Sequence, residues 1–420
     1  MRARKHLVFD IGSVYGAQLA YYVIPLATVP YLSRVLGPAS WGLLAMAQAF
    51  AMYGGLIVDY GFIYSATRQV VNASSRQEIE SIVAGVFGAK LLLAAIVALS
   101  AIIAYRFVPL FHEHALLFSI AVASEVIKAF LPTFYFFGVR RVAFSSTLDI
   151  VSRLAAAIGI FIFVHLPQDG WKVFVLQGAG GLLAFAIGST VMYSRCKFLL
   201  PRLRQSIQVL RDTGAMFLFR SAYHIFSLGN AFVLGLFATA QDVGYYAGAE
   251  KINSAAVGLL SPLSTALYPH SAALIKDSFK EAVKLTKTSL YVMCAVGAAL
   301  TLCMWFGSGL VIHIILGAKY QSSIAPFKVL SLRAPMLAWT NVLGFQWLLA
   351  LGLEKSFQQV TMIALIVNFS LAAILAPQFS FLGMSWAVIT SQAVMVIGVY
   401  FVLRRRNLNP LGITSDLIRV

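Results

Sequence analysis

The feature that most constrains this chain is a series of long apolar stretches that recurs from one end of the sequence to the other. An α-helix needs about 20 apolar residues to cross the hydrocarbon core of a bilayer. Glycines, prolines and charged residues separate the stretches. The stretches are residues 8–30, 41–63, 82–105, 115–137, 146–165, 171–194, 213–237, 244–270, 288–315, 326–350, 356–376 and 381–402. The sequence therefore predicts an all-α polytopic membrane protein with about twelve transmembrane helices.

The composition excludes a water-soluble fold. Apolar types make up 60% of the 420 residues and charged types 11%, against roughly 25% charged in an ordinary soluble protein. A single soluble core could not cover that much apolar surface. The three cysteines, Cys196, Cys294 and Cys303, have no metal-ligand spacing and indicate no disulfide framework. We therefore predict no metal site.

The basic residues are distributed unequally between the two sides of the predicted membrane. The chain has 32 Lys and Arg against 15 Asp and Glu, a formal charge of +17. If the twelve spans alternate, one side holds only Arg34, Arg106, Lys172 and Lys319. The other side holds 21 cations, which are Arg2, Arg4, Lys5, Arg68, Arg76, Arg140, Arg141, Arg195, Lys197, Arg202, Arg204, Arg211, Lys276, Lys280, Lys284, Lys287, Lys355, Arg404, Arg405, Arg406 and Arg419.

Cytoplasmic loops of membrane proteins collect Lys and Arg. The asymmetry therefore predicts that both termini face the cytoplasm. It also accounts for most of the positive charge without a nucleic-acid partner. The basic stretch 195–211 could in addition contact anionic lipid headgroups, although topology alone explains its charge.

The loops leave no room for an energy-converting domain. The outer loops 166–170, 238–243 and 377–380 are very short, and the longest inner segments, 195–212 and 271–287, are too short for a nucleotide-binding domain. The chain also lacks a G-x-x-x-x-G-K-[ST] phosphate loop. Any transport by this chain should therefore be independent of ATP. We expect no cofactor, and a coupling ion, H⁺ or Na⁺, stays open.

The chain contains an internal duplication. One offset of 202 residues, close to half the length, aligns three separate clusters. Six spans in each half give both halves the same direction through the membrane, as in parallel-repeat carriers. We predict a six-helix lobe over 1–194, a basic cytoplasmic linker over 195–212, a second six-helix lobe over 213–403 and a basic cytoplasmic tail over 404–420. The aligned clusters are Asp10-x-Gly12 with Asp212-x-Gly214, Ala20-Tyr21 with Ala222-Tyr223, and Gly42-x-x-Ala45 with Gly244-x-x-Ala247.

Several motifs in the same spans resemble those of a known family. The stretch Pro30-Tyr31-Leu32-Ser33-Arg34-Val35-Leu36-Gly37-Pro38, followed by Trp41-Gly42-Leu43, resembles the first outer loop of Wzx-type polysaccharide exporters. These belong to the multidrug/oligosaccharidyl-lipid/polysaccharide exporter superfamily. Further similar stretches are Asp59-Tyr60-Gly61, Val243-Gly244-Tyr245-Tyr246, Ala249-Glu250-Lys251-Ile252, Ser261-Pro262-Leu263 and Leu267-Tyr268-Pro269.

The resemblance implies a flippase of the bacterial inner membrane. Such a protein moves an undecaprenyl-pyrophosphate-linked oligosaccharide from the cytoplasmic to the periplasmic leaflet by alternating access, for O-antigen or exopolysaccharide synthesis. Its implied partners are this lipid-linked glycan, the bilayer and the polysaccharide polymerase machinery. Lipid II flippases and multidrug–cation antiporters are related branches, and they remain the alternatives.

Charged residues inside the predicted spans are the candidate substrate site. A charge near the membrane centre is costly, so it normally faces a partner or a wet cavity. Six deep cations stand against three deep acids, a surplus of three, and a pyrophosphate group would supply the missing negative charge. A drug–cation antiporter should instead have net carboxylate. The cations are Lys90, Lys128, Arg153, Arg220, Lys251 and Arg333, and the acids are Glu125, Asp149 and Glu250.

Part of this charge has an alternative, purely structural reading. Glu125 with Lys128 and Asp149 with Arg153 have helical spacings of three and four, so each pair could neutralise itself. Glu250 could pair with Arg220. Asp59 lies near a cytoplasmic end, where hydration is easy, so we favour an end-capping role over a coupling role there.

Two prolines are hinge candidates, Pro25 in the first span and Pro262 in the eighth. Each could instead produce a static kink that neighbouring helices satisfy.

An enzyme is the remaining class. A membrane-embedded glycosyltransferase or polymerase needs an exposed acid–base constellation. The one outer cluster, His112-Glu113-His114, is consecutive and lacks the spacing of an H-E-x-x-H zinc site. We predict a transporter without catalytic residues.

Overall fold

The computed structural model describes the backbone of residues 2–412. Side chains are described over the same range except for residues 2–23, 25–26, 109, 215–216, 218–228, 261–263, 265–266 and 269. The described chain is helical and forms two compact units, Met1–Phe232 and Val233–Val420.

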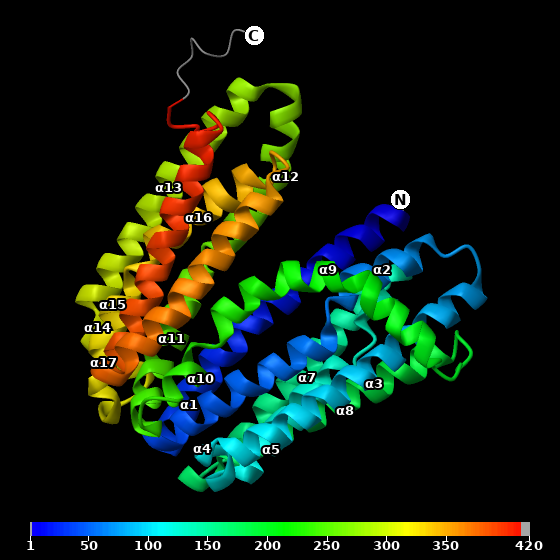
Figure 1. Cartoon of the computed structure of the whole chain (residues 1–420), viewed down its shortest axis with the longest axis horizontal. Coiled ribbons are helices and arrows are strands. Elements are labelled where there is room, and N and C mark those ends of the chain that lie inside the picture. The colour runs from blue at the N-terminus through cyan, green and yellow to red at the C-terminus, as the bar shows by residue number, and fades with distance from the viewer. Residues whose placement is uncertain (1, 413–420) are drawn as a thin grey trace. The chain divides into compact units, whose positions relative to one another are not determined.

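The N-terminal unit is built around one very long helix, α1, which is drawn in blue in Figure 1. Its elements are α1 (Arg2–Asp59), α2 (Phe62–Asn72), α3 (Arg76–Phe107), α4 (Pro109–Glu113), α5 (Ala115–Ala129), α6 (Thr133–Gly138), α7 (Val142–Phe163), the 3₁₀ turn η1 (Pro167–Asp169), α8 (Gly170–Tyr193) and α9 (Leu203–Leu228). Helix α10 (Asn230–Gly235) contains the boundary between the units.

Helix α1 holds two of the predicted spans. Its backbone leaves helical geometry at Gly37, where φ is 71° and ψ is 171°. A positive φ of this kind is costly for any residue with a Cβ atom, so glycine suits the break. The helix resumes at once, because Pro38 already has the φ that a first helical turn needs.

Helix α1 packs against α3, α5 and α7, while α8 packs against α5 and α7. At Gly180 of α8, an added Cβ would lie 2.7 Å from the backbone oxygen of Ser152 in α7. Such backbone contact is typical of helices that associate in membranes, where small residues let two helices approach closely.

The C-terminal unit consists of shorter helices and one long one. They are α11 (Ala240–Gly258), α12 (Ser261–Asp277), α13 (Phe279–Phe306), α14 (Ser308–Ile315), η2 (Ala318–Ser323), α15 (Ile324–Ser331), α16 (Arg333–Thr340), the π-helix η3 (Asn341–Leu348) and α17 (Glu354–Arg405). Helix α17, orange to red in Figure 1, holds the last two predicted spans and breaks at Ser380, where φ is 48°.

Close packing of α13 on α16 organises this unit. An added Cβ at Gly297 of α13 would lie 2.9 Å from the Cα of Pro335 in α16. The backbones therefore touch near Arg333, the first residue of α16.

The predicted all-helical polytopic fold is confirmed. Each of the twelve apolar stretches is mostly helical, and seven segments within the described chain are long and apolar enough to cross a membrane. The count of twelve, the orientation and the six-plus-six division into lobes stay predictions. The boundary between the two compact units falls at residues 232–233, within α10. The seven segments are Ala27–Asn72, Arg76–Phe107, Ala115–Gly138, Val142–Phe163, Pro167–Tyr193, Phe279–Phe306 and Glu354–Arg405.

Candidate functional site

Lys90 of α3 is the most deeply buried cation that the structure describes, with 1% of its surface exposed. Its Nζ donates to the backbone oxygen of Ala129 and lies 3.9 Å from Oδ1 of Asp59. Ala129 is the last residue of α5, so its carbonyl has lost the partner that a further helical turn would provide. The Phe134 ring lies 5.8 Å from Nζ. Lys90 thus joins the ends of α1 and α5.

Glu125 and Lys128 form an ion pair within α5, as their spacing predicts. Glycines of two other helices make room for it. An added Cβ at Gly55 of α1 would lie 3.4 Å from the Glu125 Cβ, and one at Gly181 of α8 would lie 2.6 Å from the Lys128 Cγ. This pair is therefore packed between α1 and α8.

Asp149 and Arg153 form the second predicted ion pair, with Nε of the arginine 2.9 Å from Oδ2 of the aspartate. Both side chains are well exposed on α7. Lys90, Lys128 and Arg153 therefore each have an acid beside them. The acid beside Lys90 is Asp59, which was not counted among the deep acids when the charge surplus was predicted.

The C-terminal unit contains Glu250, Lys251 and Arg333. Tyr246 donates to Oε1 of Glu250 at 3.3 Å within α11, and the neighbouring Lys251 is half-buried. Arg333 is also half-buried, and its Nε is enclosed without a hydrogen-bond partner among the described residues. An enclosed guanidinium N–H without an acceptor is costly, so this atom lacks the acceptor that it needs.

Three candidates have side chains outside the described residues, namely Arg220, Pro25 and Pro262. The predicted pairing of Arg220 with Glu250 stays a prediction for that reason. The backbone does show that α11 ends at Gly258 and that Pro262 lies in the first turn of α12. Proline is well tolerated there, so the chain turns between the two helices, just before Pro262.

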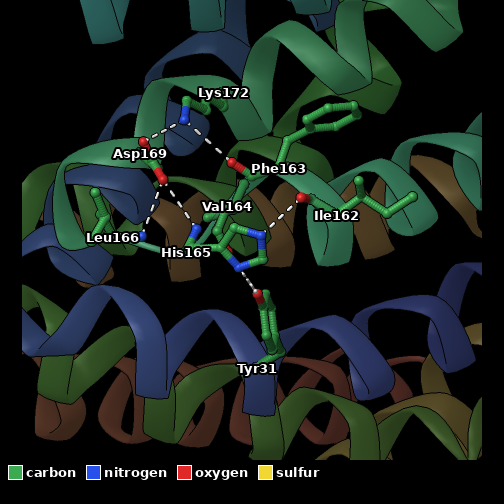
Figure 2. A network of polar contacts seen from close by, with 8 residues as sticks. All are labelled: Tyr31, Ile162, Phe163, Val164, His165, Leu166, Asp169 and Lys172. Carbon is green, nitrogen blue, oxygen red and sulfur yellow. Dashed lines mark hydrogen bonds and ion pairs between the residues drawn. The ribbon is translucent and has the colours of Figure 1, made fainter.

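A polar network that sequence reasoning missed joins α1 to the connection between α7 and α8 (Figure 2). Tyr31 donates to the backbone oxygen of Val164 at 2.6 Å, and its hydroxyl lies 3.1 Å from Nδ1 of His165. Asp169 accepts from the backbone N–H groups of His165 and Leu166, each at 3.0 Å. It also pairs with Lys172 at 2.7 Å. The sequence signal for this network was the spacing of Asp169 and Lys172, which are three residues apart and can therefore pair on one helix face.

The family of the chain follows from a comparison with known proteins. The family described as "Polysaccharide biosynthesis protein" matches residues 7–275. The chain belongs to this family. The match covers the N-terminal unit from residue 7 onward and ends within α12, so it includes the motifs on which the resemblance rests.

Two curated relatives of this polysaccharide biosynthesis protein carry the same name, "Putative O-antigen transporter". The protein of Escherichia coli (strain K12) is 26% identical over 411 residues, covering 96% of this chain and 97% of the relative. The protein of Shigella dysenteriae is 24% identical, covering 91% of this chain and 96% of the relative. The chain thus matches both over nearly their full length.

Comparison with solved structures shows the fold of this chain. A lipid II flippase, MurJ in an inward closed conformation, matches with a TM-score of 0.73 and 14% identity, over 95% of this chain and 87% of that one. An inward-facing multidrug resistance MATE family transporter of the MOP superfamily matches with a TM-score of 0.70 and 14% identity, over 93% and 96%. The fold is that of the MurJ and MATE structures, as the resemblance implied.

Proposed function

We propose that this protein is a flippase that carries a polyprenyl-pyrophosphate-linked oligosaccharide from the cytoplasmic to the periplasmic leaflet of the bacterial inner membrane, for surface polysaccharide synthesis. The observation that carries the proposal is the nearly full-length match to two relatives named "Putative O-antigen transporter". The fold shared with a lipid II flippase supports a large lipid-linked substrate. The protein acts as a transporter, without catalytic residues.

Transport proceeds by alternating access between two lobes of six helices, with both termini in the cytoplasm. The repeated clusters at one offset and the strong asymmetry of Lys and Arg support this arrangement. The inner segments have no room for a nucleotide-binding domain, so an ion gradient or the substrate gradient supplies the energy. The polysaccharide polymerase machinery receives the product.

Arg333 is the first candidate to hold the pyrophosphate, together with the predicted Arg220 and Lys251. The planar guanidinium offers paired donors that fit phosphate oxygens, and the Arg333 Nε has no acceptor among the described residues. Lys90, Lys128 and Arg153 are weaker candidates, because each has a carboxylate within 4 Å with which a phosphate must compete.

Loss of the gene, followed by mass spectrometry of the polyprenyl-linked lipids, tests the function. We expect the lipid-linked oligosaccharide to accumulate and the surface polysaccharide to disappear. An unchanged lipid pool with intact surface polysaccharide would overturn the proposal. Accumulated lipid II would instead identify a lipid II flippase, and a change in drug susceptibility alone would identify a multidrug antiporter.

A further inference from the structure

The segment between α8 and the first turns of α9, residues 194–211, combines strong positive charge with exposed apolar side chains. It contains five cations and no acid, and all five cations are exposed. The most exposed of its apolar side chains are Leu200 at 80% and Phe198 at 64%. We call residues 194–211 the basic segment. Its cations are Arg195, Lys197, Arg202, Arg204 and Arg211.

The basic segment is fixed to α3 by its inner side. The backbone N–H of Lys197 donates to Oε1 of the buried Glu80 at 2.8 Å. Further along, Nε2 of Gln205 donates to the backbone oxygen and to the hydroxyl of Ser81, each at 2.7 Å. The segment is therefore a docked element of the N-terminal unit and not a loose linker.

A glycine of α3 provides the seat for this docking. An added Cβ at Gly88 would lie 2.1 Å from the Ser206 hydroxyl and 2.6 Å from the Pro201 Cβ. Ser206 and Val209 are buried on this side of α9. Because the inner side is held so closely, the outer side of the segment presents a defined surface.

That outer surface is amphipathic. Leu203 and Ile207 are four residues apart, so they follow one another along one stripe of α9, and both are more than half exposed. Arg204 and Arg211, seven residues apart, follow the adjacent stripe. Alternating stripes of basic and large apolar side chains are typical of helices that lie in a membrane interface.

We propose that the basic segment lies in the headgroup region of the membrane leaflet and binds anionic phospholipid. Its leucines, Phe198 and Ile207 would enter the acyl boundary, where apolar side chains of this exposure are favourable. Its five cations complement phosphatidylglycerol-type headgroups. A nucleic acid or an acidic soluble protein would satisfy the cations but leave the apolar stripe in water. The inference does not depend on the substrate that the protein transports.

The depth of a spin label tests the apolar half of this proposal. A nitroxide is attached to Leu200→Cys in the full-length protein, whose native cysteines are replaced by alanine. Lys280→Cys, at the exposed start of α13, is the control. In vesicles of phosphatidylcholine with phosphatidylglycerol, we expect the label at 200 to collide with oxygen rather than with a water-soluble nickel chelate, and more so than in phosphatidylcholine alone. The label at 280 should stay accessible to nickel. Nickel access at 200 in both vesicles would overturn the proposal.

Removal of charge tests the other half. The variant Arg202→Gln/Arg204→Gln is compared with Lys280→Gln/Lys284→Gln, which removes the same charge from exposed positions of α13. Native mass spectrometry measures retention of phosphatidylglycerol. We expect the first variant to bind it about 25-fold more weakly, at roughly fivefold per cation near a lipid surface, and the control to bind it nearly as the unmodified protein does. Equal retention by both variants, or an equal loss, would contradict specific binding by this segment.

Discussion

Removal of the Asp59 carboxylate should destabilise the N-terminal unit, and the effect should depend on Lys90. The Lys90 ammonium is almost fully buried, and Asp59 lies 3.9 Å from it. In Asp59→Asn the ammonium keeps only the Ala129 carbonyl as a polar partner among the described residues. Breaking a buried pair at one partner leaves an uncompensated charge, which is more costly than removing both charges.

The size of the effect follows from the geometry. Two unit charges separated by 3.9 Å attract by about 4 kcal/mol at an effective dielectric constant of about 20. The Asp59 side chain is 45% exposed, and solvent weakens a pair of this kind. We therefore expect Asp59→Asn to lower the free energy of unfolding by about 1–2 kcal/mol.

A double-mutant cycle isolates this pair. Unfolding is measured in mixed detergent micelles for Asp59→Asn, Lys90→Met and the double variant. Since Lys90→Met removes the buried charge, Asp59→Asn should cost almost nothing in that background. If Asp59→Asn costs the same with and without Lys90, the ion pair does not stabilise the unit and the reasoning is refuted.

Three further outcomes are expected. Arg333→Ala should abolish transport while the protein still inserts, because a span becomes more hydrophobic when it loses a charge. Arg333→Lys should transport normally only if the positive charge alone is needed. Normal transport by Arg333→Ala would exclude Arg333 from the pyrophosphate site. Gly88→Leu should push the basic segment off α3, cost about 1–3 kcal/mol of stability and expose residues 194–202 to protease, and unchanged proteolysis would contradict the docking. An impermeant thiol reagent added outside should label single cysteines only at the first four of eight positions, and labelling at 208 would refute the six-plus-six topology. The eight positions are Ser40, Gln168, Gln241 and Gln378, then Ser75, Gln208, Ser278 and Ser356.

Local patterns in the sequence predicted the features that residues of a single helix determine, namely the helices themselves and the ion pairs within them. The apolar stretches became helices because helices satisfy their own backbone groups without water. The Glu125–Lys128 pair formed because residues three apart share a helix face. The short loop expected near Gly37 is instead a kink inside α1, since Pro38 restarts the helix at once.

Contacts between distant helices could not be predicted in this way. Lys90 and Asp59 belong to different helices, and no periodicity links a residue of α3 to the end of α1. Tyr31 and Val164 are 133 positions apart. The docking of 194–211 on α3 likewise depends on Gly85 and Gly88, which look like ordinary small residues of a membrane helix. Tertiary packing decides such pairs, and the local patterns along one helix do not reveal it.

Translocation in a purified system tests the flippase proposal most directly. The full-length protein is reconstituted in vesicles with a polyprenyl-pyrophosphate-linked oligosaccharide, and a membrane-impermeant lectin reports how much glycan has crossed. We expect the protein to move the glycan between leaflets, and the triple alanine variant of Arg220, Lys251 and Arg333 to fail although it is folded. Translocation by this variant at the normal rate would exclude these cations as the pyrophosphate site. No translocation by the unmodified protein, in vesicles where a known flippase is active, would contradict the proposed function.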